Sequence, residues 1–297
     1  MRSNLKKSSL LDRILSPSFW EGLSSSKDKA KGAYLKRDFW DLVAEDYDAL
    51  EETSFYRSMQ EDILQEMKKR GALRRDFTFF DVCCGTGSYA LKVAPEVFRI
   101  YALDISSSML AIFSKKIQEK GLQNIEIIEA DWRTYEPPQK YNTVFVSMTP
   151  VLRDLKEVRR LINAAKDFFI AVQWAGLRKN PLAEEIEKLF FKDRKREEHL
   201  GAFLIFNYLY TLGMPADIKF YQGFFERKSP LEKFWKRLKF RLEAKGYKVN
   251  PKKEKEIMKF LEKRTKDGFI ETKTKVRIGA LFLRKEEGTN GDNGDHC

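Results

Sequence analysis

The feature that most constrains this chain is a glycine-bearing turn between an apolar run and a helix-like segment. Residues 77–82 (FTFFDV) form a short apolar run, and Cys83-Cys84-Gly85-Thr86-Gly87 follow directly. Glycine adopts positive φ readily and lets the backbone approach a ligand, because no Cβ intrudes. Backbone amides at such a turn, and at the start of the next helix, suit a carboxylate or a phosphate. The stretch predicts a strand–turn–helix unit that binds a small ligand.

Apolar runs and helical patterns alternate after this point at the spacing of βαβ units. The alternation predicts an α/β fold with a mostly parallel sheet and helices on both faces. The predicted strands are 77–82, 98–104, 124–130, 141–148 and 167–176, and the predicted helices between them are 89–93, 106–120 and 151–164.

The flanking segments have other patterns. Helical spacing of apolar residues predicts two helices before the first strand, and a charged helix with an aromatic run interrupts the alternation at 180–215. We interpret 180–215 as a helical lid insertion within one domain, 36–285, preceded by an N-terminal extension, 1–35, and followed by a polar, disordered tail, 286–297. The other predicted elements are helices at 38–50, 56–70, 230–245 and 251–266, a strand at 218–227, and a strand pair within 268–285.

Charge is concentrated in the second half of the chain. The formal net charge is +12, and residues 178–285 hold 29 Lys and Arg against 15 Asp and Glu. A basic half can attract nucleic acid, a membrane surface or an anionic small substrate. Most of its lysines alternate with glutamates on helix-like segments, however, which favours solvated helix faces.

No apolar run reaches the length of about 18 residues that a membrane span needs, and the N-terminus lacks the apolar core of a signal peptide. The three cysteines, two of them adjacent, exclude a disulfide scaffold. We therefore expect a cytoplasmic protein without a membrane partner.

Three carboxylates lie at the ends of the first three predicted strands. Asp104 stands 17 residues after Gly87, where a carboxylate can accept both ribose hydroxyls. Asp131 precedes Trp132 and can meet the amino edge of an adenine while the indole lies beside the ring. Asp81 would repel a diphosphate but can accept a hydrogen bond from an ammonium group. The set favours a nucleoside with an amino-acid end over a dinucleotide.

These motifs resemble those of class I S-adenosylmethionine-dependent methyltransferases. The resemblance rests on residues 79–90, on Leu103-Asp104-Ile105-Ser106 with Met109-Leu110, and on Ala130-Asp131-Trp132. Upstream, Trp40, Ala44, Tyr47 and Asp48 resemble the entry helix of the small-molecule branch. The resemblance covers about residues 36–180 and implies a Rossmann-like seven-stranded sheet whose reversed last strand comes from 268–285. Cys83 stands where the family usually has glycine, and a small thiol should leave the turn intact.

The resemblance implies S-adenosyl-L-methionine as the cofactor. The backbone of 84–87 would hold its methionine part, Asp104 its ribose, and Ile105 and Met109 the faces of its adenine. The residues that we expect to bind the cofactor are Tyr47, Asp81, Cys83, Cys84, Gly85, Thr86, Gly87, Asp104, Ile105, Met109, Ala130, Asp131, Trp132 and Ser147.

The methyl acceptor leaves a weaker signal. Ser147-Met148-Thr149-Pro150 carries none of the family's motifs for exocyclic or amide nitrogens, and no cysteine that would serve cytosine-C5 chemistry. Transfer from a sulfonium releases a neutral thioether, so alignment and exclusion of water matter more than a base, and we name no catalytic residue. His199 and His296 lack metal-ligand spacing, so we expect no metal. Acceptor contacts are expected from Met148, Thr149, Trp174 and Tyr208.

The sequence therefore predicts methyl transfer to a small, anionic metabolite by in-line displacement. Three alternatives stay open. The chain can instead methylate RNA on its basic C-terminal half, serve as a non-catalytic module that binds S-adenosylmethionine, or act as a dinucleotide-dependent oxidoreductase, which Asp81 disfavours.

Overall fold

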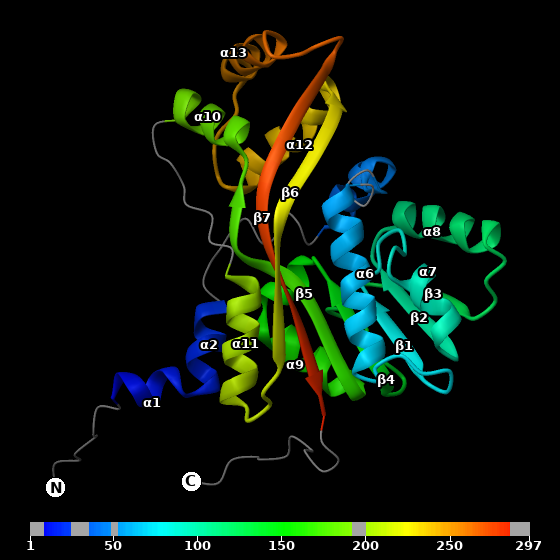
Figure 1. The fold of residues 1–297 in the computed structure, drawn as a ribbon. Helices are drawn as coiled ribbons and strands as arrows, with labels where there is room; N and C mark the ends of the chain where they lie inside the picture. The colour runs from blue at the N-terminus through cyan, green and yellow to red at the C-terminus, as the bar shows by residue number, and fades with distance from the viewer. Residues whose placement is uncertain (1–8, 25–35, 49–52, 192–199, 286–297) are drawn as a thin grey trace, which may run out of the picture.

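A computed structural model describes residues 9–24, 36–48, 53–191 and 200–285, and Figure 1 shows a single sheet flanked by helices. The seven strands are ordered β3-β2-β1-β4-β5-β7-β6. The first five are parallel, and β7 is antiparallel to both of its neighbours, β5 and β6. The strands are β1 (Thr78–Val82), β2 (Arg99–Asp104), β3 (Ile125–Glu129), β4 (Tyr141–Ser147), β5 (Ala165–Lys179), β6 (Asp217–Pro230) and β7 (Phe269–Arg284).

This arrangement confirms the predicted Rossmann-like sheet with its reversed last strand. The prediction of a strand pair within 268–285 is wrong, because β7 is one continuous strand of 16 residues. From Phe269 to Arg277, exposed positions alternate with positions that are partly or fully buried. From Ile278 to Leu283 every position is buried, so both faces of the strand are covered. That change of pattern marks the passage of one strand from the periphery into the core.

Helices cover both faces of the sheet. One face packs against α6 (Ser54–Lys69), α7 (Ala90–Val93) and α8 (Ser107–Glu119). The other packs against α2 (Pro17–Ser24), α9 (Leu155–Ala164) and α11 (Gly201–Thr211). Phe79 and Phe80 are neighbours in β1, both fully buried, and point to opposite faces. Such strands appear in sequence as continuous apolar runs, which is why the prediction located them well.

Several predicted helices are shorter or broken. The helix expected at 38–50 is α4 (Arg37–Val43), followed by a 3-10 turn, η1 (Ala44–Asp46). The helix expected at 151–164 divides into η3 (Pro150–Arg153) and α9, because the Asp154 side chain caps α9 by accepting from the Lys156 amide. Part of the predicted N-terminal extension forms α1 (Leu10–Ile14) and α2, which buries Trp20. The predicted disordered tail and both histidines lie outside the described residues.

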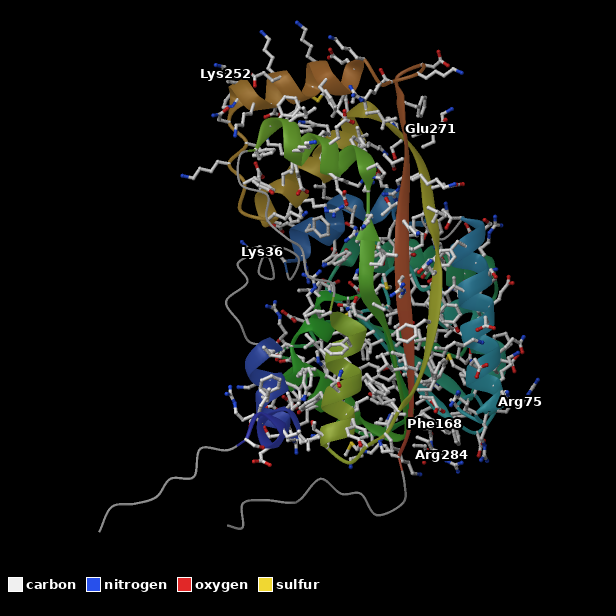
Figure 2. The ribbon with its side chains drawn as sticks, turned by 60° about the vertical axis from the view of Figure 1, so that its left-hand side comes forward. Lys36, Arg75, Phe168, Lys252, Glu271 and Arg284 are labelled. Atoms are coloured by element: carbon white, nitrogen blue, oxygen red, sulfur yellow. The ribbon has the colours of Figure 1, made fainter. Side chains whose placement is uncertain are left out.

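Strands β5, β6 and β7 extend well beyond the rest of the sheet. They are 15, 14 and 16 residues long, against five to seven in the others. Their projecting ends carry α10 (Pro181–Phe190), α12 (Leu231–Ala244) and α13 (Pro251–Glu262), which share a separate apolar core and which we call the upper cluster. Figure 2 shows Glu271 near the upper end of β7 and Arg284 at its lower end.

The segment that we interpreted as a lid, 180–215, belongs to two places in the structure. Its first helix, α10, is part of the upper cluster, whereas α11 packs against β5 on the face of the sheet (Figure 1). The residues between these helices, 192–199, are not described.

A buried ion pair lies inside the upper cluster. The Glu187 carboxylate on α10 is only 4% exposed, accepts from Lys245 Nζ at 2.8 Å and lies 3.4 Å from the Tyr247 hydroxyl. Lys245 follows α12 directly, so the pair joins two helices of the cluster.

We predict that Lys245→Met lowers the free energy of unfolding by about 3 kcal/mol, because it leaves the Glu187 carboxylate buried without its cation. Urea denaturation followed by circular dichroism measures the loss. The double variant Glu187→Leu/Lys245→Met should recover most of it, and Lys248→Met, at an exposed position, should have no effect. Equal losses in Lys245→Met and Lys248→Met would contradict the structural role of the pair.

Candidate cofactor and acceptor site

Two adjoining cavities open at the carboxyl ends of β1, β2 and β4. The larger has a volume of about 330 Å³ and the smaller about 50 Å³. In an open α/β sheet this edge is where ligands bind. Their common wall is formed by seven residues, namely Trp40, Tyr47, Cys83, Ser147, Met148, Thr149 and Pro150.

The turn after β1 is built by two glycines in the left-handed region. Gly85 has φ +55° and Gly87 has φ +79°. A Cβ added to Gly87 would lie 2.1 Å from the ring of Phe113, so this position admits no side chain. The turn is closed by a hydrogen bond from the Gly87 amide to the Cys84 carbonyl at 3.0 Å. The glycines therefore serve both the backbone conformation and the close packing of α8.

Cys83 is the unusual residue of this turn. Its φ is +59°, a conformation that costs a residue with a Cβ about 1 kcal/mol. Burial, with the nearby charge of Asp104 as the next cause, raises the pKa of the Cys83 thiol. Burial likewise raises the pKa of Cys84. Both sulfurs are therefore protonated at neutral pH, which does not suit a nucleophile.

We predict that Cys83→Gly folds with a Tm within a few degrees of the wild type, because relief of the positive φ offsets the lost burial of the thiol. Cys83→Val should lower the stability by about 2 kcal/mol or more, since a β-branched side chain tolerates this conformation poorly. Thermal unfolding checks both variants. A Cys83→Val protein as stable as Cys83→Gly would show that the turn is not constrained as described.

Asp104 joins the turn to the start of α8. Its side chain is 6% exposed, and its two carboxylate oxygens accept from the Gly85 amide at 2.8 Å and the Ser106 amide at 2.9 Å. A carboxylate has about four acceptor sites, so both oxygens can still accept ligand hydroxyls. Asp104 lines the smaller cavity together with Ile105 and Met109. Burial raises the pKa of Asp104 above its ordinary value of 3.8.

We predict that Asp104→Ala weakens binding of S-adenosylhomocysteine by more than tenfold, because charge-assisted hydrogen bonds to the ribose are lost. In the wild type, affinity should fall as the pH is lowered through the raised pKa of Asp104, since the protonated form gives up that charge. Isothermal titration calorimetry between pH 8 and pH 4 measures both effects. Asp76→Ala, at an exposed site, is the control. Equal affinity in Asp104→Ala and the wild type would remove Asp104 from the site.

Asp131 and Trp132 line the smaller cavity, as expected for the adenine end. The Asp131 carboxylate is held by Arg133, a residue that the sequence prediction missed. Arg133 donates to the Asp131 carboxylate from its Nε at 3.0 Å and from its backbone amide at 3.0 Å. Burial alone would raise the pKa of Asp131, but these bonds outweigh it and lower the pKa. Trp132 is 2% exposed, with Arg160 over its ring at 4.9 Å. The indole is therefore fixed in the core at one edge of the cavity.

The larger cavity begins at Asp81, which is 3% exposed at the end of β1. Gln173, which the sequence prediction missed, positions the opposite wall. Its Nε2 donates to the Thr149 carbonyl at 2.9 Å, and its Oε1 accepts from the Trp174 amide at 2.9 Å. Met148 next to Thr149 has φ +54°. The end of β4 thus turns sharply, and one buried amide holds it in place.

Two carboxylates of the N-terminal segment fasten it to the turn and to α8, and the sequence analysis gave neither a role in the site. Asp41 on α4 accepts from the Ser106 hydroxyl at 2.5 Å and the Ser108 amide at 3.2 Å. Asp48 accepts from the Thr86 hydroxyl at 2.6 Å and pairs with Lys116 at 2.7 Å. They are seven residues apart, which is two turns of the helix expected at 38–50. This spacing was the only signal in the sequence that linked the two carboxylates.

Most of the expected site residues line one of the two cavities. Thr86 and Gly87 line neither, because the Thr86 hydroxyl is held by Asp48 and Gly87 packs on Phe113. Tyr208, an expected acceptor contact, also lines neither; it is fully buried on α11, where its hydroxyl donates to Glu21 at 2.7 Å. The residues that do line a cavity are Tyr47, Asp81, Cys83, Cys84, Gly85, Asp104, Ile105, Met109, Ala130, Asp131, Trp132, Ser147, Met148, Thr149 and Trp174.

Arginines dominate the charge of the larger cavity, which the sequence analysis did not foresee. Among the described residues that line it there is one acid, Asp81. The lining includes five arginines from four elements, Arg153, Arg178, Arg227, Arg237 and Arg241. Arg237 and Arg241 are four residues apart on α12, but the other three are distant from them and from one another in the sequence. The fold therefore brings the set together.

Two kinds of feature are absent from the described residues. No group of three or more His, Cys, Asp or Glu side chains is arranged to hold a metal ion. No helix there has the length and apolarity to cross a membrane.

The sequence is similar to known proteins over the segment from β1 to the start of β5. Residues 79–168 match the family model described as a methyltransferase domain. The demethylmenaquinone methyltransferase of Geobacillus kaustophilus is 30% identical over 98 residues, which make up 31% of this chain and 40% of that protein. Its counterpart from Bacillus mycoides is 32% identical over 93 residues, 28% of this chain and 38% of that one. The chain thus matches less than half the length of these curated relatives.

A solved structure has a similar fold over most of the chain. The crystal structure of the [4+2]-cyclase SpnF aligns over 85% of this chain and 95% of that chain, with a TM-score of 0.50 and 15% identity. At this identity the likeness shows the fold alone. Because a cyclase shares the fold, the reaction has to be argued from the family match and the site.

Proposed function

We propose, from the premise that this chain carries a class I S-adenosylmethionine-dependent methyltransferase domain, that it transfers a methyl group to a small, anionic metabolite. One observation carries the proposal. The smaller cavity, lined by residues that we expect to bind the nucleoside, adjoins a larger one whose described lining includes five arginines and a single acid.

The residues present fit S-adenosylmethionine. Asp104 would accept the ribose hydroxyls, Ile105 and Met109 would flank the adenine, and the backbone of the Gly85 turn would hold the methionine part. Asp81 would accept from the α-ammonium group of the methionine part. When bound, the cofactor supplies a sulfonium methyl whose leaving group is a neutral thioether.

The protein's task is then to align the acceptor and exclude water. Aromatic side chains in the larger cavity, among them Trp40, Tyr89 and Trp174, provide apolar walls for this. No histidine or lysine lines the cavity among the described residues, and its one acid is assigned to the cofactor. The arrangement therefore suits an acceptor atom that needs no strong base, such as the oxygen of an ionised carboxylate.

A labelled-methyl assay tests the proposal. The chain is incubated with radiolabelled S-adenosylmethionine and a small-molecule extract freed of protein and nucleic acid. We predict that label enters products that an anion exchanger retains, and that Asp104→Ala reduces the rate by more than tenfold. Label that enters added RNA instead would favour the RNA methyltransferase. Binding of the cofactor with no transfer to any fraction would favour a non-catalytic module.

The RNA alternative draws on the lysines of the second half of the chain. These are mostly exposed, and Figure 2 shows the Lys252 side chain on α13 pointing away from the molecule. Four arginines of the same segment, Arg178, Arg227, Arg237 and Arg241, instead line the larger cavity. This division supports an anionic metabolite as the acceptor, because a basic residue that recognises the substrate should face the site of transfer.

A further inference from the structure

We infer that the upper end of the larger cavity is a separate subsite for a group with two or more negative charges, remote from the transferred methyl. The inference rests on the proposed function and deepens it. The acceptor would be an elongated molecule with a phosphate-type oxyanion at one end, an apolar middle section and the methyl-accepting atom at the other end.

The register of the projecting strands places polar groups on one face. Thr272, Thr274 and Val276 alternate along β7 and so point to the same side. Arg178 on β5 pairs with Val276, and Arg227 on β6 pairs with Thr272. Both arginines and both threonines line the cavity. This face of the strands thus forms the floor of the subsite.

The helix α12 forms the roof. Arg237 and Arg241 are four residues apart, which places them on one face of the helix, and both line the cavity. Arg237 donates to the hydroxyl of Ser229 on β6 at 2.7 Å. Four arginines from β5, β6 and α12 therefore line the same cavity.

The subsite is well separated from the methyl-transfer end. Val172, opposite Ser147 at the end of β4, pairs with Ala280, whereas Arg178 pairs with Val276. Four residues of β7 separate these levels, about 13 Å at the rise of an extended strand. Thr272, which pairs with Arg227, lies another four residues along β7 from Val276, away from the methyl-transfer end. A compact metabolite would not reach from one end to the other.

Aromatic rings line the cavity both between its two ends and among the arginines. Phe39 on α4 stacks on Phe240 of α12 with centroids 4.2 Å apart, and both line the cavity. Trp174 on β5 pairs with Ile278, between the two ends, and Phe225 on β6 pairs with Thr274, among the arginines. Both also line the cavity, and their ring centroids are 6.1 Å apart. This section suits an apolar or planar body of the acceptor.

The choice of arginine is the strongest indication. Residues 178–285 contain 20 lysines and nine arginines, yet the described cations that line the cavity from this segment are four arginines and no lysine. A guanidinium presents a planar fork that matches the oxygens of a phosphate, whereas an ammonium is a point charge. Asn180, whose amide donates to the Thr274 hydroxyl at 2.8 Å, holds the floor next to them. The selection of fork-shaped cations indicates a group with several oxygens.

Calorimetric titration with pyrophosphate, in the presence of S-adenosylhomocysteine, tests the subsite. We expect pyrophosphate to bind the wild type, acetate not to bind measurably, and Arg227→Gln to weaken pyrophosphate binding at least tenfold. Arg227→Lys should recover only part of the loss, because it restores the charge without the fork. The control is Arg277→Gln, which removes the same charge from an exposed position of β7, where Arg277 contacts Gln222.

The outcomes separate the two proposals. Binding of S-adenosylhomocysteine without binding of pyrophosphate would overturn the subsite and leave the methyltransferase assignment intact. So would an equal loss of pyrophosphate affinity in Arg227→Gln and Arg277→Gln. Binding of pyrophosphate that depends on Arg227, in a protein that does not bind S-adenosylhomocysteine, would support the subsite and refute the cofactor assignment.

Discussion

The antiparallel pairing of β7 with β5 and β6 is the constraint on which the rest of the structure depends. In its lower half β7 completes the core, with Ile278 to Leu283 buried between two layers of helices. In its upper half the same strand leaves the core and supports the upper cluster. One ladder therefore holds the projecting strands around the larger cavity to β5, which in turn pairs with β4 beside the smaller cavity.

The candidate cofactor end of the site could be predicted from sequence to a large extent, for a local reason. The strand–turn–helix unit, its glycines and the carboxylates Asp81, Asp104 and Asp131 all lie within short stretches, each at the end of a buried apolar run. A sheet buried on both faces leaves a strong pattern, and parallel strands bring their carboxyl ends to one edge. Position along the chain was then enough to place these side chains near one another.

The acceptor end could not be predicted, because its parts meet only through strand register. Nothing in the sequence around Arg178, Arg227 or Arg241 distinguishes these arginines from the other cations of a basic segment. Most of those cations suggest solvated helix faces. The continuity of β7 was hidden by its change of pattern near Arg277. Gly279 adds to that impression of a break, but it is a point of close approach, since a Cβ there would lie 2.8 Å from that of Ala202 on α11. Tyr208 was singled out as a polar aromatic, and tertiary packing buried it instead.

The helix α4 has contacts on both sides of the boundary between the two cavities. Asp41 attaches it to α8 beside the cofactor residues, while Phe39 attaches it to α12 beside the arginines. A ligand in either cavity that favours one position of α4 must favour it for the other ligand as well. By thermodynamic reciprocity, the two compounds would then alter each other's affinity by the same factor. A single short helix would in this way make the binding of ligands in the two cavities cooperative.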